Sequence, residues 1–303
     1  MSTVPPPAEI KNRYAYLVPV GCLIIVGALL GLTANVARLA ISAGWHPVSF
    51  LFWSALGAGG LLLLASARVR QLPGRTKNHI RYYVVAGMLS FALPNALAFA
   101  AIPHVGVSFV ALCLAFPPLL TYGLALTLKM DMFVPLKVAG LLAGLAGAAL
   151  LAVSKGVTDM AELNWIGLAM VGPVVIALGN IYRTLRWPPN ASAISLAPGM
   201  LLGGAVLLAA YAQAYSLPIL PQPFTADQTG LLAGQILIFA VTYTLYFVLQ
   251  RLAGPVYMSQ IGWVGAIFGA GMAVWLLGEA ATPTLGLVLT LIILGILLVS
   301  RSR

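Results

Sequence analysis

Apolar segments of about twenty residues, separated by short polar turns, fill almost the whole of this 303-residue chain. That is the length a helix needs to cross a bilayer. The segments are too long and too evenly apolar for the strands of a membrane barrel, which alternate in period two. Only 7% of the residues are charged, against about 25% in a typical soluble domain. We therefore predict an all-α integral membrane protein and exclude an ordinary soluble globular domain.

Ten of these segments are predicted to be transmembrane helices. They cover residues 15–36, 47–67, 82–101, 105–128, 135–153, 164–182, 192–215, 229–249, 256–277 and 283–300. The turns between them leave no room for a separate soluble domain. Basic residues precede the first segment, as in a signal peptide, but its apolar run is longer than such a peptide's core, so we interpret it as an uncleaved span. Residues 1–14 are expected to be a disordered cytoplasmic tail.

The net charge of +10 lies mostly between the apolar segments. In a soluble protein it would suggest nucleic-acid binding, but the cytoplasmic loops of membrane proteins are also rich in Lys and Arg. With the N-terminus in the cytoplasm, 14 of the 16 basic residues fall on the cytoplasmic side, Arg183 among them, and only Arg38 and Lys155 fall outside. This asymmetry predicts a multi-pass membrane protein with both termini cytoplasmic and no nucleic-acid partner. The short loops and small size indicate the inner membrane.

The second half of the chain resembles the first at an offset of 148 residues. Gly106 then aligns with Gly254, and Asp131 aligns with Glu279. The predicted halves, residues 15–153 and 154–303, hold five spans each. Because five is odd, the second half would enter the membrane in the opposite sense, as in many secondary transporters. The alternative is a chance similarity between apolar segments of low complexity.

Two stretches of sequence indicate a family. Residues 101–118 read AIPHVGVSFVALCLAFPP, and residues 254–265 read GPVYMSQIGWVG, followed by the Gly278–Glu279 turn. With ten spans in two halves, the chain resembles the drug/metabolite transporter superfamily, in chains built of two EamA-type units. It departs from that pattern where Met130–Asp131 replaces Gly-Glu and where Gly265–Ala266 aligns with Pro117–Pro118.

This resemblance implies a transporter working by alternating access. Within the superfamily the chain is most similar to exporters of amino acids, broad in specificity and favouring aromatic and neutral ones, or of related small metabolites. The alternatives are a drug or nucleotide-sugar carrier and a proton-coupled antiporter. A lipid-modifying membrane enzyme or a scaffold without transport are further alternatives, from other classes.

Several motifs are absent from the sequence. There is no phosphate-binding loop of an ATPase, no metal-ligand spacing and no catalytic acid–base or nucleophile set. We expect no enzyme activity, no cofactor and no metal. No carboxylate lies in the middle of a predicted span, which argues against proton coupling. Asp131 and Glu279 lie at span ends and are expected to cap the helices that follow them. The Gly-x-x-x-Gly segments leave the oligomeric state open, and a monomer is compatible with them.

Polar residues inside the spans are the best candidates for a substrate site, since a polar group facing lipid is costly. The candidates for a central cavity are Asn35, Ser90, Asn95, Gln235, Thr242, Tyr246, Ser259, Gln260 and Trp263. Amide and indole N–H groups could donate to an amino-acid carboxylate, and aromatic faces could contact its ammonium group. The alternative is that these side chains only join neighbouring helices.

Proline supplies a candidate hinge. Pro117 and Pro118 lie midway along the fourth predicted span, where each removes a backbone hydrogen bond and kinks the helix. Such a kink near the midplane could be the pivot of alternating access. The alternative is a static kink.

Overall fold

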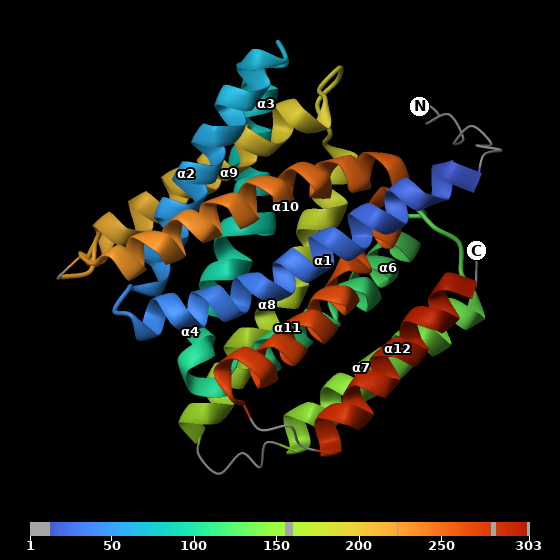
Figure 1. The fold of residues 1–303 in the computed structure, drawn as a ribbon. Helices are drawn as coiled ribbons and strands as arrows, with labels where there is room; N and C mark the ends of the chain where they lie inside the picture. The colour runs from blue at the N-terminus through green and yellow to red at the C-terminus, as the bar shows by residue number, and fades with distance from the viewer. Residues whose placement is uncertain (1–12, 155–159, 223, 280–282, 302–303) are drawn as a thin grey trace.

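The computed structural model describes residues 13–154, 160–222, 224–279 and 283–301, and every element in these ranges is a helix (Figure 1). The first half contains α1 (Arg13–Ser42), α2 (Pro47–Arg68), α3 (Lys77–Gly87), η1 (Met88–Ala92), α4 (Leu93–Val105), α5 (Val107–Cys113), α6 (Pro117–Thr127) and α7 (Pro135–Ser154). The second half contains α8 (Met160–Leu185), α9 (Ala193–Ala214), α10 (Ala226–Ser259), α11 (Ile261–Leu277) and α12 (Pro283–Arg301). Residues 1–12 of the predicted tail and Lys155 lie outside the described residues.

The helices follow the predicted apolar segments, with differences at three places. The third segment is longer than predicted and contains a turn of π-helix, η1, between α3 and α4. The fourth segment is divided, because α5 ends at Cys113 and α6 begins at Pro117. Helix α10 runs through the predicted turn at Gly254, whose backbone alone leaves the helical conformation there. The prolines at 117 and 118 thus begin a helix instead of kinking a continuous one.

Seven stretches of helix are long and apolar enough to cross a membrane. They are Val18–Ser42, Pro47–Arg68, Lys77–Val105, Val107–Thr127, Leu163–Leu185, Ala193–Ala214 and Ala226–Ser259. Helix α11 and part of α12 are shorter apolar helices. The chain is therefore a multi-pass membrane protein, and the count of ten spans stays a prediction.

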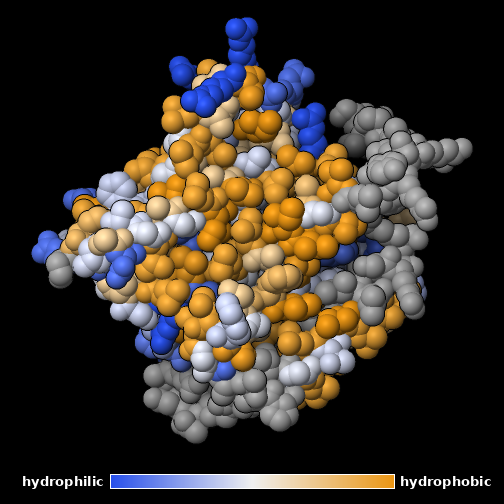
Figure 2. Space-filling view, in the orientation of Figure 1, coloured by the Kyte–Doolittle hydropathy of each residue, from blue (hydrophilic) through white to orange (hydrophobic). Residues whose placement is uncertain are grey.

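Apolar side chains cover the outside of the bundle. Leu64, Val206, Leu237 and Trp275 are each at least 60% exposed. Figure 2 shows apolar residues across the face over α1 and α10, with hydrophilic residues gathered at the tip where α2 meets α3. This surface suits a lipid environment, where exposed apolar side chains cost nothing.

Helices from the two halves pack against each other throughout the bundle. Helix α1 packs on α10 and α11, α2 on α9, α4 on α8, and α7 on α12 (Figure 1). Glycines allow the closest approaches: a Cβ on Gly31 of α1 would lie 2.6 Å from the Gly265 carbonyl oxygen of α11. A Cβ on Gly262 would collide with the carbonyl oxygen of Leu114. The halves are therefore joined by direct backbone contact.

Several features recur at the 148-residue offset seen in the sequence. Gly106 and Gly254 both have a positive φ, 80° and 75°, which favours glycine. Three contacts join residues that are 148 apart. They are Asn95 Nδ2 to the Tyr243 hydroxyl (3.3 Å), Trp263 Nε1 to the Ala115 carbonyl (3.0 Å), and Gly262 against Leu114. At these points each half meets the corresponding residue of the other.

Candidate functional site

A small cavity lies where the two halves meet, and its volume is about 80 Å³. Its walls come from α1, η1, α4, α6, α8, α10 and α11. The lining residues are Leu30, Ser90, Pro94, Asn95, Ala98, Leu114, Pro117, Ile176, Asn180, Tyr243, Tyr246, Ser259, Ile261 and Gly262. A ligand pocket usually has about 300–1,000 Å³. The cavity is therefore small, and a substrate larger than a few waters would require the helices to part.

A second cavity of about 60 Å³ adjoins the first and shares part of its wall. Leu30, Pro94, Asn95 and Leu114 border both. The second cavity extends past Thr33 toward Pro173 and is lined mainly by apolar side chains. Both cavities are lined mainly by apolar side chains, with a few polar groups among them.

Irregular backbone shapes the wall of the first cavity. Ser90 lies in η1, a π-helical turn, and such turns are frequent at functional sites. Pro94 follows at the start of α4, and Asn95 donates from its side chain to the Phe91 carbonyl (2.8 Å). On the opposite wall Pro117 begins α6 after the break in the fourth segment. Proline thus interrupts regular helix on both sides of the cavity.

Asn180 of α8 is the centre of a buried polar network. Its Nδ2 donates to Thr121 Oγ1 (3.1 Å), while its Oδ1 accepts from the Tyr246 hydroxyl (3.0 Å) and from Arg183 Nη2 (2.9 Å). Its backbone carbonyl accepts from Gln250 Nε2 (3.3 Å). All these side chains are buried. The network fixes Asn180 and Tyr246 at the edge of the cavity.

Arg183 is fully buried behind Asn180 and Tyr246, with 0% of its surface exposed. Its Nε donates to Gln250 Oε1 (2.8 Å), and its guanidinium carbon lies 4.3 Å from the centre of the Tyr246 ring. The prediction that Arg183 belongs to a cytoplasmic loop is wrong, because it lies within α8 and packs against α10. A count of basic residues treats every arginine between two apolar segments as a loop residue. It cannot show that an arginine in the last turn of a helix is buried inside the bundle.

The predicted cavity residues fall into two groups. Ser90, Asn95, Tyr246 and Ser259 line the cavity, as does the predicted hinge residue Pro117. Pro118 is buried beside it in the first turn of α6. The structure brings these side chains together from four helical elements, η1, α4, α6 and α10.

The other predicted residues lie within the bundle, off the cavity lining. Asn35 donates to the carbonyls of Gly31 (3.0 Å) and Gly269 (3.1 Å), joining α1 to α11. Gln235 donates to Thr33 Oγ1 (3.3 Å), and Trp263 donates to the Ala115 carbonyl.

Two further candidates complete this group. Thr242 is buried, and its hydroxyl has no hydrogen-bond partner among the described residues. Gln260 is buried at the junction of α10 and α11, where its carbonyl accepts from the Trp263 amide (3.0 Å).

Several residues at the site were not among the candidates predicted from the sequence. Asn180 and Tyr243 line the cavity, and Thr121, Arg183 and Gln250 surround Asn180. One signal was available: Asn180 and Arg183 are three residues apart and therefore share a face of α8. Thr121 and Gln250 lie far from Asn180 in the sequence, and only packing brings them together.

The acidic residues at span ends act differently from the prediction. Glu279 accepts hydrogen bonds from the amides of Val107 (2.8 Å) and Ser108 (3.1 Å), so it caps α5 of the other half. Asp131 accepts from Lys137 (3.2 Å) and from the neighbouring Met132 amide (2.7 Å). Negative charge stabilises a helix N-terminus wherever it comes from, so tertiary packing decides which helix is capped.

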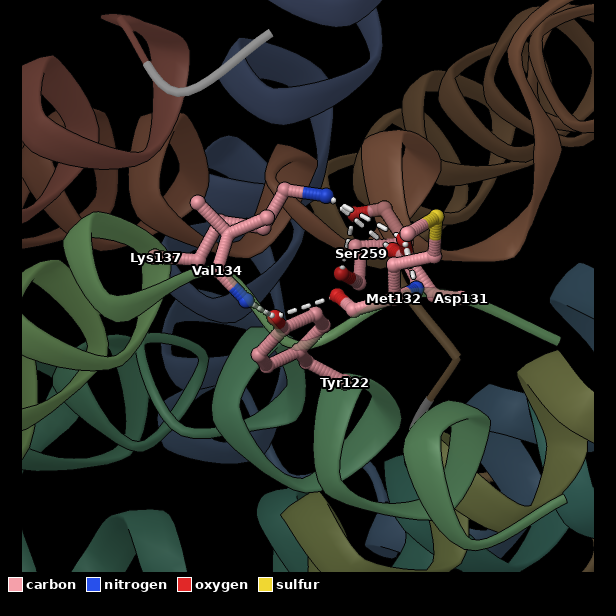
Figure 3. A network of polar contacts seen from close by, with 7 residues as sticks. Tyr122, Asp131, Met132, Val134, Lys137 and Ser259 are labelled. Carbon is pink, nitrogen blue, oxygen red and sulfur yellow. Dashed lines mark hydrogen bonds and ion pairs between the residues drawn. The ribbon is translucent and has the colours of Figure 1, made fainter. Parts of the chain in front are cut away.

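Figure 3 shows the surroundings of Asp131. The Tyr122 hydroxyl donates to the Met132 carbonyl (2.8 Å) and accepts from the Val134 amide (2.9 Å), and Lys137 lies 5.3 Å from the centre of the Tyr122 ring. These contacts fix the turn between α6 and α7. No group of three or more metal-ligating side chains occurs among the residues that the structure describes.

Comparison with known proteins identifies part of the chain. Residues 19–153 match the model of the EamA-like transporter family. A crystal structure of another protein is similar over 92% of this chain and 98% of its own length, with a TM-score of 0.69 and 19% sequence identity. At that identity the likeness shows the fold alone. No curated protein sequence matches this chain.

Proposed function

We propose that this chain, whose residues 19–153 match the EamA-like transporter family, is a membrane transporter of the drug/metabolite superfamily and exports amino acids or similar small metabolites by alternating access. The observation that carries the proposal is a small cavity between the halves, lined by Asn, Tyr and Ser side chains together with apolar ones. A small amphipathic molecule fits this lining, since its polar groups can bind amide and hydroxyl groups.

The architecture that we propose for this transport is ten spans in two inverted halves. Two equivalent units related by a twofold axis touch each other through equivalent residues only at that axis. The pairs Asn95–Tyr243 and Ala115–Trp263 are each 148 positions apart, as the proposed symmetry would require, and Asn95, Leu114, Tyr243 and Gly262 all line the cavity. A binding site at the interface of inverted repeats is the arrangement that lets one half rock against the other.

The direction of transport in the proposal rests on topology. With the N-terminus in the cytoplasm, the exposed Arg70 and Arg75 between α2 and α3, and Lys77 at the start of α3, face the cytoplasm. Glu279 and the start of α5 then lie on the outer side. The hydrogen bonds from Val107 and Ser108 to Glu279 would hold the outer end of the pathway together in the closed state.

We expect the break between α5 and α6 to serve as a hinge. Pro117 and Pro118 prevent the two helices from joining, because neither residue has a backbone N–H. Replacing both with Ala allows a continuous helix and should slow transport about tenfold, equivalent to roughly 1.4 kcal/mol on the barrier. Initial flux into liposomes measures the effect. Pro198→Ala, in the interior of α9, is the matched control and should leave flux unchanged; equal flux in the double variant would remove the hinge role.

The experiment that tests the proposed function is solute flux with purified protein in liposomes. Radiolabelled phenylalanine, leucine, lysine and glutamate are supplied with and without a pH gradient. We expect saturable flux of phenylalanine and leucine without a gradient. Flux that requires the gradient would instead indicate a proton-coupled antiporter. If no amino acid moved while a drug or nucleotide sugar did, the proposal of amino-acid export would be wrong.

A further inference from the structure

We propose that Arg183 is the binding group for a carboxylate, so that the substrate class of this transporter is defined by a negative charge and not by an ammonium group. This inference rests on the proposed transport through the central cavity. It starts from an arginine that is fully buried with neutral partners around it. The contacts of its guanidinium are Gln250, Asn180, Met258 and the Tyr246 ring.

The charge of Arg183 is not balanced within the described part of the chain. The salt bridge found there joins Lys137 to Asp131, and Glu279 is bound to the start of α5. A buried cation is costly unless it is paired and hydrogen-bonded. Arg183 also has a buried nitrogen, Nη1, that has no hydrogen-bond partner. A buried guanidinium with an unpartnered N–H donor is suited to the reversible binding of an anion.

A second unpartnered donor among the described residues is the hydroxyl of Tyr82, which lies within electrostatic range of Arg183. This hydroxyl is buried, and it also interacts electrostatically with Tyr246. Tyr82 comes from α3, so it faces α8 and α10 from a third helix. An oxygen anion between these helices would satisfy both unpartnered donors.

The connection to the cavity is the amide oxygen of Asn180. This oxygen accepts from Arg183 Nη2 (2.9 Å) and from the Tyr246 hydroxyl (3.0 Å), and both Asn180 and Tyr246 line the cavity. A carboxylate oxygen has the same acceptor geometry and adds a negative charge, which strengthens each hydrogen bond. The incoming carboxylate therefore exchanges with the Asn180 oxygen and takes over the two donors. Opening of the α8–α10 contact gives it access to Nη1.

The rest of the cavity defines the remainder of the substrate. Leu30, Ala98 and Ile176 form an apolar wall that continues into the second cavity. No acidic side chain lines either cavity, so an ammonium group finds only carbonyl oxygens and aromatic faces such as Tyr243. The geometry thus favours a small carboxylate with an apolar or aromatic tail, in which the amino group contributes little.

Three compounds with the same aromatic tail separate the two ends of an amino acid. Phenylalanine has both charged groups, phenylalaninamide lacks the carboxylate, and phenyllactate lacks the ammonium group. Binding of each is measured with purified protein in detergent without anionic lipid, so that no headgroup supplies the anion. We expect phenylalanine and phenyllactate to bind within about threefold of each other, and phenylalaninamide to bind at least about 30-fold more weakly, as expected for a lost charge-assisted contact.

Variants at the end of α8 test the residue itself. Arg183→Gln should weaken phenyllactate binding at least about 30-fold, and Arg183→Lys should retain part of it, since Lys keeps the charge but not the planar donor pair. Arg186→Gln removes an equal charge from an exposed position one turn away and should bind normally. The comparison of amide and acid on the unmodified protein remains decisive if Arg183→Gln does not fold.

The outcomes distinguish this inference from the proposed function. Equal binding of phenylalaninamide and phenylalanine, unchanged binding in Arg183→Gln, or no binding of any carboxylate would overturn the role of Arg183. If phenylalanine is transported but its carboxylate proves dispensable, amino-acid export stands and the inference falls. If phenyllactate binds through Arg183 but liposomes carry no amino acid, the inference stands and amino-acid export falls.

Discussion

Asn180→Asp is expected to abolish transport of carboxylates while making the protein more stable. The new carboxylate would lie where the Asn180 oxygen already accepts from Arg183 Nη2 and the Tyr246 hydroxyl. Thr121 keeps a partner because its hydroxyl can donate to the carboxylate in place of accepting from the amide. Arg183 then has an internal counter-ion. The anion site is occupied from within, and flux should fall at least about 100-fold, or roughly 2.7 kcal/mol.

The stability of the same variant moves in the opposite direction. Arg183 is already desolvated, so supplying its partner should raise the free energy of unfolding by about 1–3 kcal/mol. The thermal unfolding midpoint in detergent measures this change. Asn95→Asp is the matched control: it adds a carboxylate to the cavity lining at a position on α4, where Asn95 contacts the Phe91 carbonyl and the Tyr243 hydroxyl. That carboxylate meets no arginine and should lower the midpoint. A lower midpoint for Asn180→Asp would contradict the assigned position of Arg183.

Gly262→Ala is expected to give the largest loss of stability from adding a single methyl group. The new Cβ would collide with the carbonyl oxygen of Leu114, which is backbone and cannot rotate away. Helix α11 would have to separate from the turn after α5, where Trp263 also donates to the Ala115 carbonyl. Overpacking typically costs about 1–3 kcal/mol, and we expect the upper end of this range or more. The unfolding midpoint and the yield of folded protein measure the effect.

Gly271→Ala provides the comparison within the same helix. A Cβ there has no atom within 4 Å, so the substitution adds a methyl group without a collision. Because Ala is a better helix former than Gly by about 1 kcal/mol, this variant should be neutral or slightly more stable. Equal midpoints for the two variants would mean that the close contact between the halves does not contribute to stability.

Much of the fold could be predicted because it depends on local properties. Hydrophobic length places the membrane helices, and the predicted segments coincide with helices in the structure. The breaks were harder to predict. The sequence aligned Gly106 with Gly254, and both residues have a positive φ in the structure. Only α10 continues past its glycine, Gly254, and the sequence did not indicate this difference. The division of the fourth segment at Pro117 likewise depends on packing against α11 as well as on proline.

The candidate site was predictable only in part. Asn35 and Asn95 are the same residue type in apolar helices, and the sequence treats them alike. The structure uses Asn35 to join α1 to the Gly269 carbonyl and places Asn95 in the cavity wall. A polar group buried in a membrane protein must find a partner, but the partner lies on another helix. Sequence periodicity within one helix therefore cannot tell a joining contact from a cavity residue.

The sequence by itself determined that this protein is a bundle of membrane helices, because burial in lipid requires long apolar segments with internally satisfied backbones. It also determined the family resemblance of the first half. Only the tertiary structure decided which partners the charged side chains of Arg183 and Glu279 contact. It placed Arg183 in the interior beside Asn180, Gln250 and Tyr246, and it placed Glu279 on the start of α5. Electrostatic and hydrogen-bond partners are set by distances in space, and residues 60 or more positions apart, such as Arg183 and Gln250, meet only when the helices pack.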